Sequence, residues 1–455
     1  MTRQSSFQGF PSTALLSLLL TCFFDGSTTV LGGDLPPVEP GFTRIFNGKN
    51  LEGWKVAGGG KKESWIVKDG VLHASPGGNW LAYKKSYGDF ILRLDWKMSR
   101  GANSGIFFRV PTTGDGSSPY GGFEAQITNN SRKPEHCTGA LYGIIPISTD
   151  PKKWYKKQEA ADVWHSYEIF CVGKRIVVRV DNVECVNASY DDNKEEMKKR
   201  PLEGLIGFQD AHAGGETTNQ FRNIRISELN ADGLSAGFKR ILTPGKETGW
   251  HKIKTVHGTG GSWKMVDGAW VGEQDPPGSG NGGVMVSDGR YDNFELIIET
   301  FPDWGPCSGI FLRSTESGQC YQNMVDHHGG GNIGSIYGEG SGGFENRNYE
   351  IDDAKEAYLK KEFQNNIPFP IDPANWHRRW NYDGYNEIRA RMVGNPPSID
   401  VWLNGVHVTR FKDTEIRKML DEDGKGPNGI QVHRGKGWPK GTKVRFRNIQ
   451  IRELS

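Results

Sequence analysis

The segment FRNIQIREL, residues 446–454, closes the chain, and an almost identical segment, FRNIRISEL, occupies residues 221–229. A single repeated segment can arise by chance, so the test is whether other segments recur in the same order. The stretch GFTRIFNGKNLEGW at 41–54 returns without a gap as GFKRILTPGKETGW at 237–250. This order predicts a tandem duplication that ends twice in the same strand.

Further pairs of segments recur between these ends in the same order. SWIVKDGVL (64–72) corresponds to SWKMVDGAW (262–270), YGDFIL (87–92) to YDNFEL (291–296), SGIFFR (104–109) to SGIFLR (308–313) and GALYG (139–143) to GSIYG (334–338). The spacing between partners varies, so the copies differ by insertions and deletions. We therefore expect two domains, at residues 41–229 and 238–455, joined by a polar linker at 230–237.

Composition limits the kinds of partner. The 455-residue chain carries 56 Lys and Arg against 54 Asp and Glu, and its formal net charge is +2. Such a balance creates no long-range field that would gather nucleic acid or an anionic membrane. A neutral ligand is favoured, and the 14 Trp, 14 Tyr and 22 Phe supply flat faces that stack on sugar rings or fill cores.

The N-terminus predicts export. Residues 1–33 are typical of a secretory signal peptide, because Arg3 precedes an apolar run, ending at Phe24, that is too short to span a bilayer. Cleavage leaves a proline-rich spacer at 34–40 in a periplasmic or extracellular protein with no integral membrane segment. The alternative is a lipid anchor at Cys22, which is disfavoured because threonine precedes it where a lipobox has Gly, Ala or Ser.

Five cysteines follow the signal peptide: Cys137, Cys171, Cys185, Cys307 and Cys320. An odd number argues against a full disulfide framework. Their spacing includes no CxxC pair, so a structural zinc site is not expected. Cys307 and Cys320 flank a predicted hairpin, where a local disulfide is expected.

Short runs of alternating apolar residues predict strands throughout both copies. Asp181-Asn182 and Asn404-Gly405 are hairpin-turn signals. Dense turns between short strands favour an all-β fold with one sandwich in each copy. The exception is IDDAKEAYLKKEF (351–363), where early Asp residues and a Glu–Lys pair four apart predict a helix.

Taken in order, the segments GFTRIFNGKNLEGW, SWIVKDGVL, NSGIFFR, FEAQI, GALYG, WHSYEI and GFQDAHAGG…FRNIRISEL resemble the family of 3-keto-disaccharide hydrolase domains. The resemblance covers nearly all of the mature chain as two tandem copies. It implies a concanavalin-A-like jelly-roll sandwich in each copy and a glycan substrate oxidised at C3.

The chemistry that the resemblance implies differs from ordinary glycoside hydrolysis. A C3 ketone acidifies the C2 hydrogen, so a base can form an enolate that expels the C1 substituent, and added water then gives net hydrolysis. This needs a base, an acid for the leaving group, and an electrophile or metal near the C3 oxygen. The paired carboxylates of retaining sandwich glucanases are not required.

FEAQI places Glu124 and Gln126 on one face of a strand and offers no second carboxylate there. Arg109 is expected to face the same surface and to hold Glu124 ionised, although a solvated ion pair is the simpler alternative. Asn129 replaces an acidic residue of the family pattern, which weakens any metal site in this copy. Tyr142 is a candidate for stacking on a sugar or for a core position.

GFQDAHAGG brings Gln209, Asp210 and His212 together on a glycine-rich turn, where histidine can serve as acid, base or metal ligand. A solvated loop histidine is the plainer interpretation. The resemblance favours function, with Glu124, Asp210 and His212 catalytic. The predicted substrate-binding residues are Arg109, Gln126, Tyr142 and Gln209, with Arg313 and Tyr337 in the second copy.

The second copy lacks the candidate base. Gln322, Met324 and Val432 replace Glu124, Gln126 and Asp210. Polar loop residues instead form a candidate site for a divalent metal ion as cofactor. These candidate ligands are Asp326, His327, His328 and His433; polar loop residues around glycines are the simpler interpretation.

The leading hypothesis is an exported carbohydrate-active enzyme whose first copy cleaves 3-keto-glycosides. Its diverged second copy would bind glycan or complete the groove. The alternative is a non-catalytic glycan-binding protein, and a scaffold or adhesion module is a third possibility that needs neither Glu124 nor His212.

Overall fold

The computed structural model describes residues 35, 37–112, 119–128, 133–150, 161–192, 195–212, 216–359, 371–414 and 423–455, without the side chains of residues 344 and 345. The predicted signal peptide, Cys22 and Asn129 lie outside these residues. Among the described residues, no helix has the length and apolar character needed to cross a membrane.

The described residues of the first half form one eight-stranded and one five-stranded antiparallel sheet. Across the larger sheet lie β11 (Val183–Ser189), β10 (Arg175–Val180), β9 (His165–Val172), β6 (Phe90–Met98), β13 (Asn219–Glu228), β4 (Val71–Ala74) and β3 (Trp65–Lys68), with β1 (Thr43–Arg44) paired to β13. Across the smaller lie β2 (Trp54–Ala57), β5 (Trp80–Tyr87), β12 (Gly204–Gln209), β7 (Asn103–Val110) and β8 (Phe123–Thr128). The connections contain η1 (Lys62–Ser64), η2 (Pro119–Gly121), η3 (Pro134–His136) and α2 (Glu195–Lys198).

The second half repeats this plan with additional strands. Across its first sheet lie β16 (Ser262–Val266), β17 (Ala269–Glu273), β30 (Val444–Glu453), β19 (Phe294–Pro302), β26 (Asn386–Val393), β27 (Ser398–Leu403) and β28 (Val406–Lys412), with β14 (Lys239–Arg240) paired to β30. Across its second lie β15 (Trp250–Ile253), β18 (Gly283–Tyr291), β29 (Gly426–Val432), β20 (Gly309–Leu312), β21 (Cys320–Val325), β22 (Gly331–Glu339), β24 (Tyr349–Ile351) and β25 (Ala357–Leu359), with β23 (Gly343–Asn346) paired to β22. The turn η5 (Pro373–Arg378) precedes β26.

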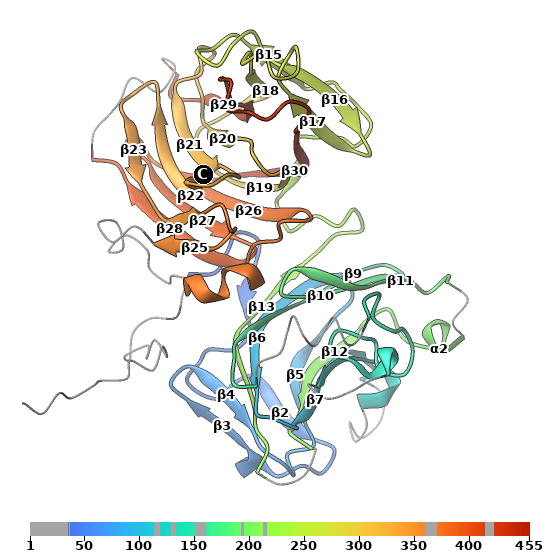
Figure 1. The fold of residues 1–455 in the computed structure, drawn as a ribbon. Helices are drawn as coiled ribbons and strands as arrows, with labels where there is room; N and C mark the ends of the chain where they lie inside the picture. Colours follow the sequence, from blue (N-terminus) through green and yellow to red (C-terminus); the bar gives the residue numbers. More distant parts are fainter. Residues whose placement is uncertain are drawn as a thin grey trace, which may run out of the picture.

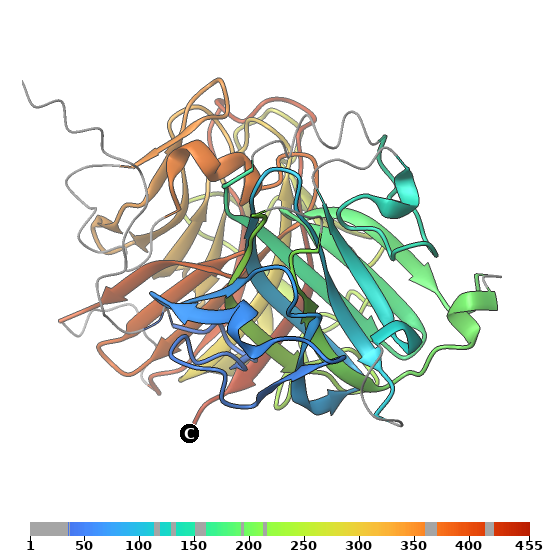
Figure 2. The ribbon, with the colours of Figure 1, turned by 90° about the horizontal axis from the view of Figure 1, so that it is seen from below.

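Each half is a jelly-roll sandwich with a core of its own. In the first half, Leu92 and Ile169 of the larger sheet share one buried cluster with Ile106 and Phe208 of the smaller sheet. A separate cluster fills the second half. Figure 1 shows the two sandwiches, one blue to green and the other yellow-green to red, and in the view of Figure 2 the blue strands lie in front. The predicted all-β fold is confirmed.

The repeated FRNI segment forms the central strands β13 and β30, and each strand contains a bulge. Asn223 and Asn448 have φ of 53° and 50°, in the left-handed region that Asn tolerates better than most residues. The pairing of β13 with β6 shifts register between Arg222 and Arg225. Strict alternation would place Phe221 and Ile224 on opposite faces, but the bulge turns both into the core.

The two predicted hairpin turns are also confirmed. Asp181 and Asn182 have φ of 48° and 61° and join β10 to β11, and Asn404 and Gly405 have φ of 45° and 79° and join β27 to β28. Positive φ at both central residues is what a two-residue turn of this kind requires. The turn chemistry of the sequence therefore fixes these two connections locally.

The helix predicted at 351–363 is wrong over its described part. Strands β24 and β25 form a hairpin there, and residues 360–363 lie outside the description. The Asp352 carboxylate accepts a hydrogen bond from the Glu356 N–H at 2.9 Å, which closes a turn instead of capping a helix. Lys355 has φ of 65°, which is incompatible with a right-handed helix.

The expected disulfide between Cys307 and Cys320 is also wrong, because both thiols are free. The register of the β20–β21 hairpin explains the separation. Gly309 faces Met324 and Leu312 faces Tyr321, so Cys307 lies beyond one end of the paired region and Cys320 lies at the other. Residues that flank a hairpin in sequence need not be cross-strand partners.

The two halves meet through buried charges. Glu39, from the spacer, accepts a hydrogen bond from Arg225 Nε at 2.6 Å and lies 3.2 Å from Arg93 Nη1. Arg93 also lies 2.7 Å from Glu387 of the second half, whose carboxylate pairs in turn with Arg389. The spacer is therefore part of the contact that fixes one sandwich against the other.

Candidate functional site

The outer face of the five-stranded sheet carries the candidate residues of the first half. Strand β8 turns Phe123, Ala125 and Ile127 into the core, so Glu124 and Gln126 point to the opposite face. Trp80 and Phe107 lie on this face and pack edge to face, with ring centroids 6.0 Å apart. Both rings are buried, so they form an apolar layer beside the side chains of Glu124 and Gln126.

Glu124 lies on β8, the last strand of this sheet, in a poorly solvated position. It is opposite Phe107 in the pairing of β7 with β8, and its side chain lies over Gly105, where an added Cβ would come within 2.3 Å of Glu124 Oε1. Only 9% of the residue is exposed. Burial raises the pKa of Glu124 to about 8, and among the described residues no charged group offsets that effect. The carboxyl can therefore exchange a proton near neutral pH.

A cleft of about 350 Å³ opens on the same half. Its lining consists of Gly59, Gly60, Gly77, Asn79, Phe107, Pro119, Tyr120, Gln209, Asp210 and His212. Glu124 is not part of this lining, but it is the cross-strand partner of Phe107, which is. The cleft brings the GFQDAHAGG turn together with η2, which precedes the FEAQI strand in the sequence.

Asp210 and His212 form a pair at one wall of the cleft. Asp210 Oδ2 accepts hydrogen bonds from the backbone N–H groups of Gly77 and Asn79, both at 2.9 Å, which fixes the carboxylate and the loop around it. Its other oxygen, Oδ1, is 4.0 Å from His212 Nδ1. The His212 side chain is 43% exposed, so the imidazole can contact a ligand.

Of the other predicted substrate-binding residues Gln209, Gln126 and Tyr142, only Gln209 lines this cleft. Gln209 is next to Trp80 across the strands, and its Oε1 atom is buried without a hydrogen-bond partner among the described residues. Gln126 is almost fully buried, and its Oε1 accepts from the Ile127 N–H at 3.1 Å. Tyr142 is exposed, and its N–H donates to the Glu124 carbonyl at 2.9 Å. Gln209 and Tyr142 are thus better placed than Gln126 to meet a ligand.

The expectation that Arg109 shares a surface with Glu124 is wrong. Arg109 is fully buried and donates to the carbonyls of Gly88 and Gly173, at 3.0 and 2.9 Å from Nη2. Its φ of 52° interrupts the strand alternation that would have placed it beside Phe107. Arg313 in the second half has φ of 50° and is equally buried, so neither arginine can contact a ligand at the surface.

Tyr120 is a cleft residue that the sequence analysis did not identify. It belongs to η2, is 64% exposed, and lies edge to face with Phe107 at a centroid distance of 6.1 Å. Its hydroxyl is hydrogen-bonded to Gln209. The available signal was the exposed aromatic in PYGG immediately before the FEAQI strand.

The corresponding position of the second half holds an amide network. Gln322 Nε2 donates to Gln431 Oε1 at 2.9 Å, and Gln431 Nε2 is 3.0 Å from His257 Nε2. His257 Nε2 is also 3.3 Å from Glu339. Tyr337 faces Gln322 across β21 and β22. A neutral amide thus occupies the place of the Glu124 carboxyl.

The metal candidates of the second half separate in space. His327 is buried, its Nδ1 donates to the Asp303 carbonyl at 2.9 Å, and its Nε2 accepts from Trp380 Nε1 at 3.2 Å, so both nitrogens are occupied. The His433 ring packs against His257. The prediction of one cluster is therefore wrong for these two histidines, whereas Asp326 and His328 do lie together, beside Cys307.

Comparison with known proteins gives matches over both halves. The family model described as a 3-keto-alpha-glucoside-1,2-lyase-like domain matches residues 41–227 and 240–452. A 3-keto-disaccharide hydrolase of Bacteroides thetaiotaomicron is 28% identical over 250 residues, which is 43% of this chain and 81% of the relative.

Solved structures are also similar to parts of the chain. A Parabacteroides distasonis protein, provisionally described as a glycosyl hydrolase, is 26% identical and has a TM-score of 0.35, covering 41% of this chain and 99% of its own. A carbohydrate-binding module of Bacillus subtilis is 12% identical and has a TM-score of 0.26, covering 45% of this chain and 97% of its own.

Proposed function

Because the chain belongs to the family of 3-keto-alpha-glucoside-1,2-lyase-like domains, we propose that it cleaves the glycosidic bonds of 3-keto-glycosides at the cleft of its first half. The observation that carries the proposal is Glu124, a buried carboxyl with a pKa of about 8 beside a cleft lined by Asp210 and His212. A base is most effective when its pKa is close to the working pH.

In the proposed reaction, Glu124 removes the proton from C2 of the oxidised sugar. The electron pair moves into the C2–C3 bond and onto the C3 oxygen, and the resulting enolate expels the C1 substituent. His212 donates a proton to the leaving oxygen. Water then adds to the unsaturated sugar, which gives net hydrolysis.

Other residues of the cleft would hold the sugar. Tyr120 offers an exposed aromatic face, and Gln209 Oε1, which has no hydrogen-bond partner among the described residues, would accept a hydrogen bond from a sugar hydroxyl. Leaving a buried acceptor unpaired costs about 1–3 kcal/mol, so a ligand that satisfies Gln209 recovers part of that cost.

We propose that the second half binds glycan without cleaving it. Gln322 stands where Glu124 stands in the first half, and its amide is already hydrogen-bonded to Gln431. An amide cannot act as the proton acceptor that the reaction requires. The test measures glycan binding by variants that carry substitutions in one half at a time. Binding by the first half alone would contradict this assignment.

The test compares 3-keto-glycosides with their unoxidised parents. We expect turnover of the keto-substrates alone, and Glu124→Gln should lower kcat/KM by about 10²- to 10⁴-fold, the usual contribution of a general base. Glu228→Gln is the matched control, because Glu228 is an exposed glutamate paired with Lys85 in the same half. Glycan binding without turnover of any keto-substrate would refute the enzymatic proposal and favour the lectin-like alternative.

The site of action is proposed to be outside the cytoplasm, on the strength of the N-terminal signal-peptide pattern. The mature protein should begin after residue 33. N-terminal sequencing of the protein recovered from the periplasm or medium checks this, and an intact residue 1 on the native protein would contradict it.

A further inference from the structure

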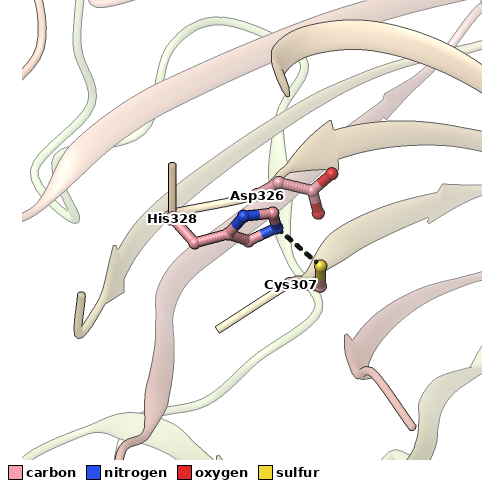
Figure 3. Close-up of side chains that lie close together, drawn as sticks. All are labelled: Cys307, Asp326 and His328. Carbon is pink, nitrogen blue, oxygen red and sulfur yellow. Dashed lines mark hydrogen bonds between the residues drawn. The ribbon is translucent and has the colours of Figure 1, made fainter. Parts of the chain in front are cut away.

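Cys307, Asp326 and His328 form a compact cluster in the second half, and neither proposed role of the chain uses it (Figure 3). The sulfur, a carboxylate oxygen and an imidazole nitrogen all lie within 4.8 Å of one another. Cys307 Sγ is 2.9 Å from His328 Nε2. In Figure 3 the imidazole faces the sulfur, and the Asp326 carboxylate lies on the adjacent strand end.

The β20–β21 hairpin positions the two ends of this cluster. Gly309 faces Met324, and continuation of that register places Cys307 opposite Asp326. The Val325 N–H donates to the Ser308 carbonyl at 2.9 Å, which maintains the pairing up to the cluster. At the corresponding place in the first half, Asn103 faces Thr128. The second half therefore has two strong metal ligands where the first half has none.

Additional hydrogen bonds fix the orientation of His328 and Asp326. His328 Nδ1 lies 2.8 Å from the Gly329 carbonyl, to which it must donate, and this leaves the Nε2 lone pair directed at Cys307. Asp326 is 5% exposed, and its Oδ1 accepts from the Ser308 N–H at 3.2 Å. Such outer contacts commonly fix the tautomer and direction of metal ligands.

We propose that Cys307, Asp326 and His328 bind a thiophilic divalent cation, of which zinc is the representative. Binding breaks the S–H bond of Cys307, forms a sulfur–metal bond and releases one proton to solvent. Zinc bonds of about 2.0–2.3 Å place tetrahedral ligand atoms roughly 3.5 Å apart, a separation that small side-chain rotations reach from the observed cluster. Thiolate and imidazole ligands exclude the hard cations calcium and magnesium.

Three protein ligands leave one tetrahedral position open. A structural zinc site usually has four protein ligands, whereas a site with three keeps a water or a ligand oxygen in the fourth position. The cluster is therefore suited to hold a metal-bound water or a sugar oxygen. The metal proposal does not depend on cleavage in the first half.

The test uses the full-length protein and the chemistry of its thiols. Among the five cysteines that follow the predicted signal peptide, Cys137, Cys171, Cys185 and Cys320 are buried and Cys307 is partly exposed, so iodoacetamide should label Cys307 first of these five. Saturating Zn²⁺ should slow labelling of the Cys307 peptide by about tenfold or more, with release of about one proton per bound ion. Unchanged labelling in the presence of Zn²⁺ would overturn the proposal.

Substitution and spectroscopy provide an independent check. His328→Gln should weaken Zn²⁺ binding by more than about 100-fold. This exceeds the loss of affinity that usually follows removal of a residue that only hydrogen-bonds to a metal ligand. His251→Gln is the control, because His251 is an exposed histidine flanked by Asp288 and Glu316 in the same half. Co²⁺ bound to the unmodified protein should show a thiolate charge-transfer band in the near ultraviolet. Loss of binding in His251→Gln with retention in His328→Gln, or Co²⁺ binding without that band, would refute the assignment.

Discussion

At Glu124 and Glu387, burial has opposite outcomes because their neighbours differ. Burial raises the pKa of both carboxyls, but Arg389 and Arg93 outweigh it at Glu387 and hold that pKa well below its ordinary value. Burial raises the pKa of Glu124 to about 8, and among the described residues no charged group offsets that rise. The arginine expected to ionise Glu124 instead binds backbone carbonyls within the fold. One glutamate is therefore poised for proton transfer and the other for a permanent ion pair.

The first prediction concerns the pH dependence of activity. If Glu124 acts as the base, kcat/KM for a 3-keto-glycoside should fall by about tenfold per pH unit as the pH drops below about 8. A pH–rate profile of the unmodified protein measures this. A profile that is flat between pH 5 and 8 would show that Glu124 is not the proton acceptor.

The contribution of Glu124 to the free energy of unfolding should change with pH in the opposite direction to activity. The folded pKa of Glu124 lies above its unfolded value of 4.5, so the folded state binds the proton more tightly between those values. The contribution is complete below pH 4.5 and is lost as the pH rises through about 8. Glu124→Gln should flatten this part of the stability profile in urea titrations, and an unchanged profile would argue against the buried, proton-binding state.

At the scale of elements, the bulge in the FRNI strand decides which residues reach the core. Asn223 has a left-handed backbone, and its side-chain amide donates to Asp95 Oδ2 at 2.7 Å. Asn448 repeats the arrangement with Glu299 in the second half, at 2.9 Å. A local backbone conformation is thus duplicated together with the carboxylate that stabilises it.

This gives a prediction for the strand. Asn223→Val should lower the free energy of unfolding of the first half by about 2–4 kcal/mol, because a β-branched residue is strained at positive φ and the bond to Asp95 is lost. Asn223→Gly keeps the backbone conformation and should cost only about 1 kcal/mol. Urea unfolding followed by tryptophan fluorescence measures both. Equal effects of Val and Gly would show that the bulge is not a constraint.

At the scale of the whole molecule, buried ion pairs connect the two sandwiches. Burial raises the pKa of Glu39, but Arg225 and Arg93 outweigh burial and hold it below the ordinary value. Removing one partner from such a network leaves an uncompensated buried charge. The network also includes the spacer, so the segment before the first strand contributes to the arrangement of the halves.

We expect Arg93→Ala to destabilise the protein by about 3–5 kcal/mol at neutral pH. Lys85→Ala, which removes a surface pair with Glu228, should cost at most about 1 kcal/mol. Because Glu39 and Glu387 have folded pKa values below the unfolded value of 4.5, their contribution is present above pH 4.5 and is lost in acid. Thermal unfolding across this range checks the effect, and equal losses for the two variants would contradict the role of the network.

The sequence by itself determined the features that depend on local order. Alternation and turn residues predicted the strands and the hairpins at Asp181-Asn182 and Asn404-Gly405, because strand periodicity and positive φ are properties of a few consecutive residues. Comparison of the copies showed that Glu124 is replaced by Gln322. The same local reasoning failed at 351–363, where the Asp352 side chain closes a hairpin turn.

Only the tertiary structure decided which residues meet and how they are solvated. Left-handed backbone at Arg109 removed that side chain from the face of Glu124, and the sequence carries no signal for this reversal. Tyr120 reaches Gln209 only through the packing of η2 against the sheet. The proximity of Cys307 to His328 depends on cross-strand register. Burial and register are properties of contacts between distant segments. The candidate base could therefore be predicted from the sequence, whereas its pKa and its neighbours could not.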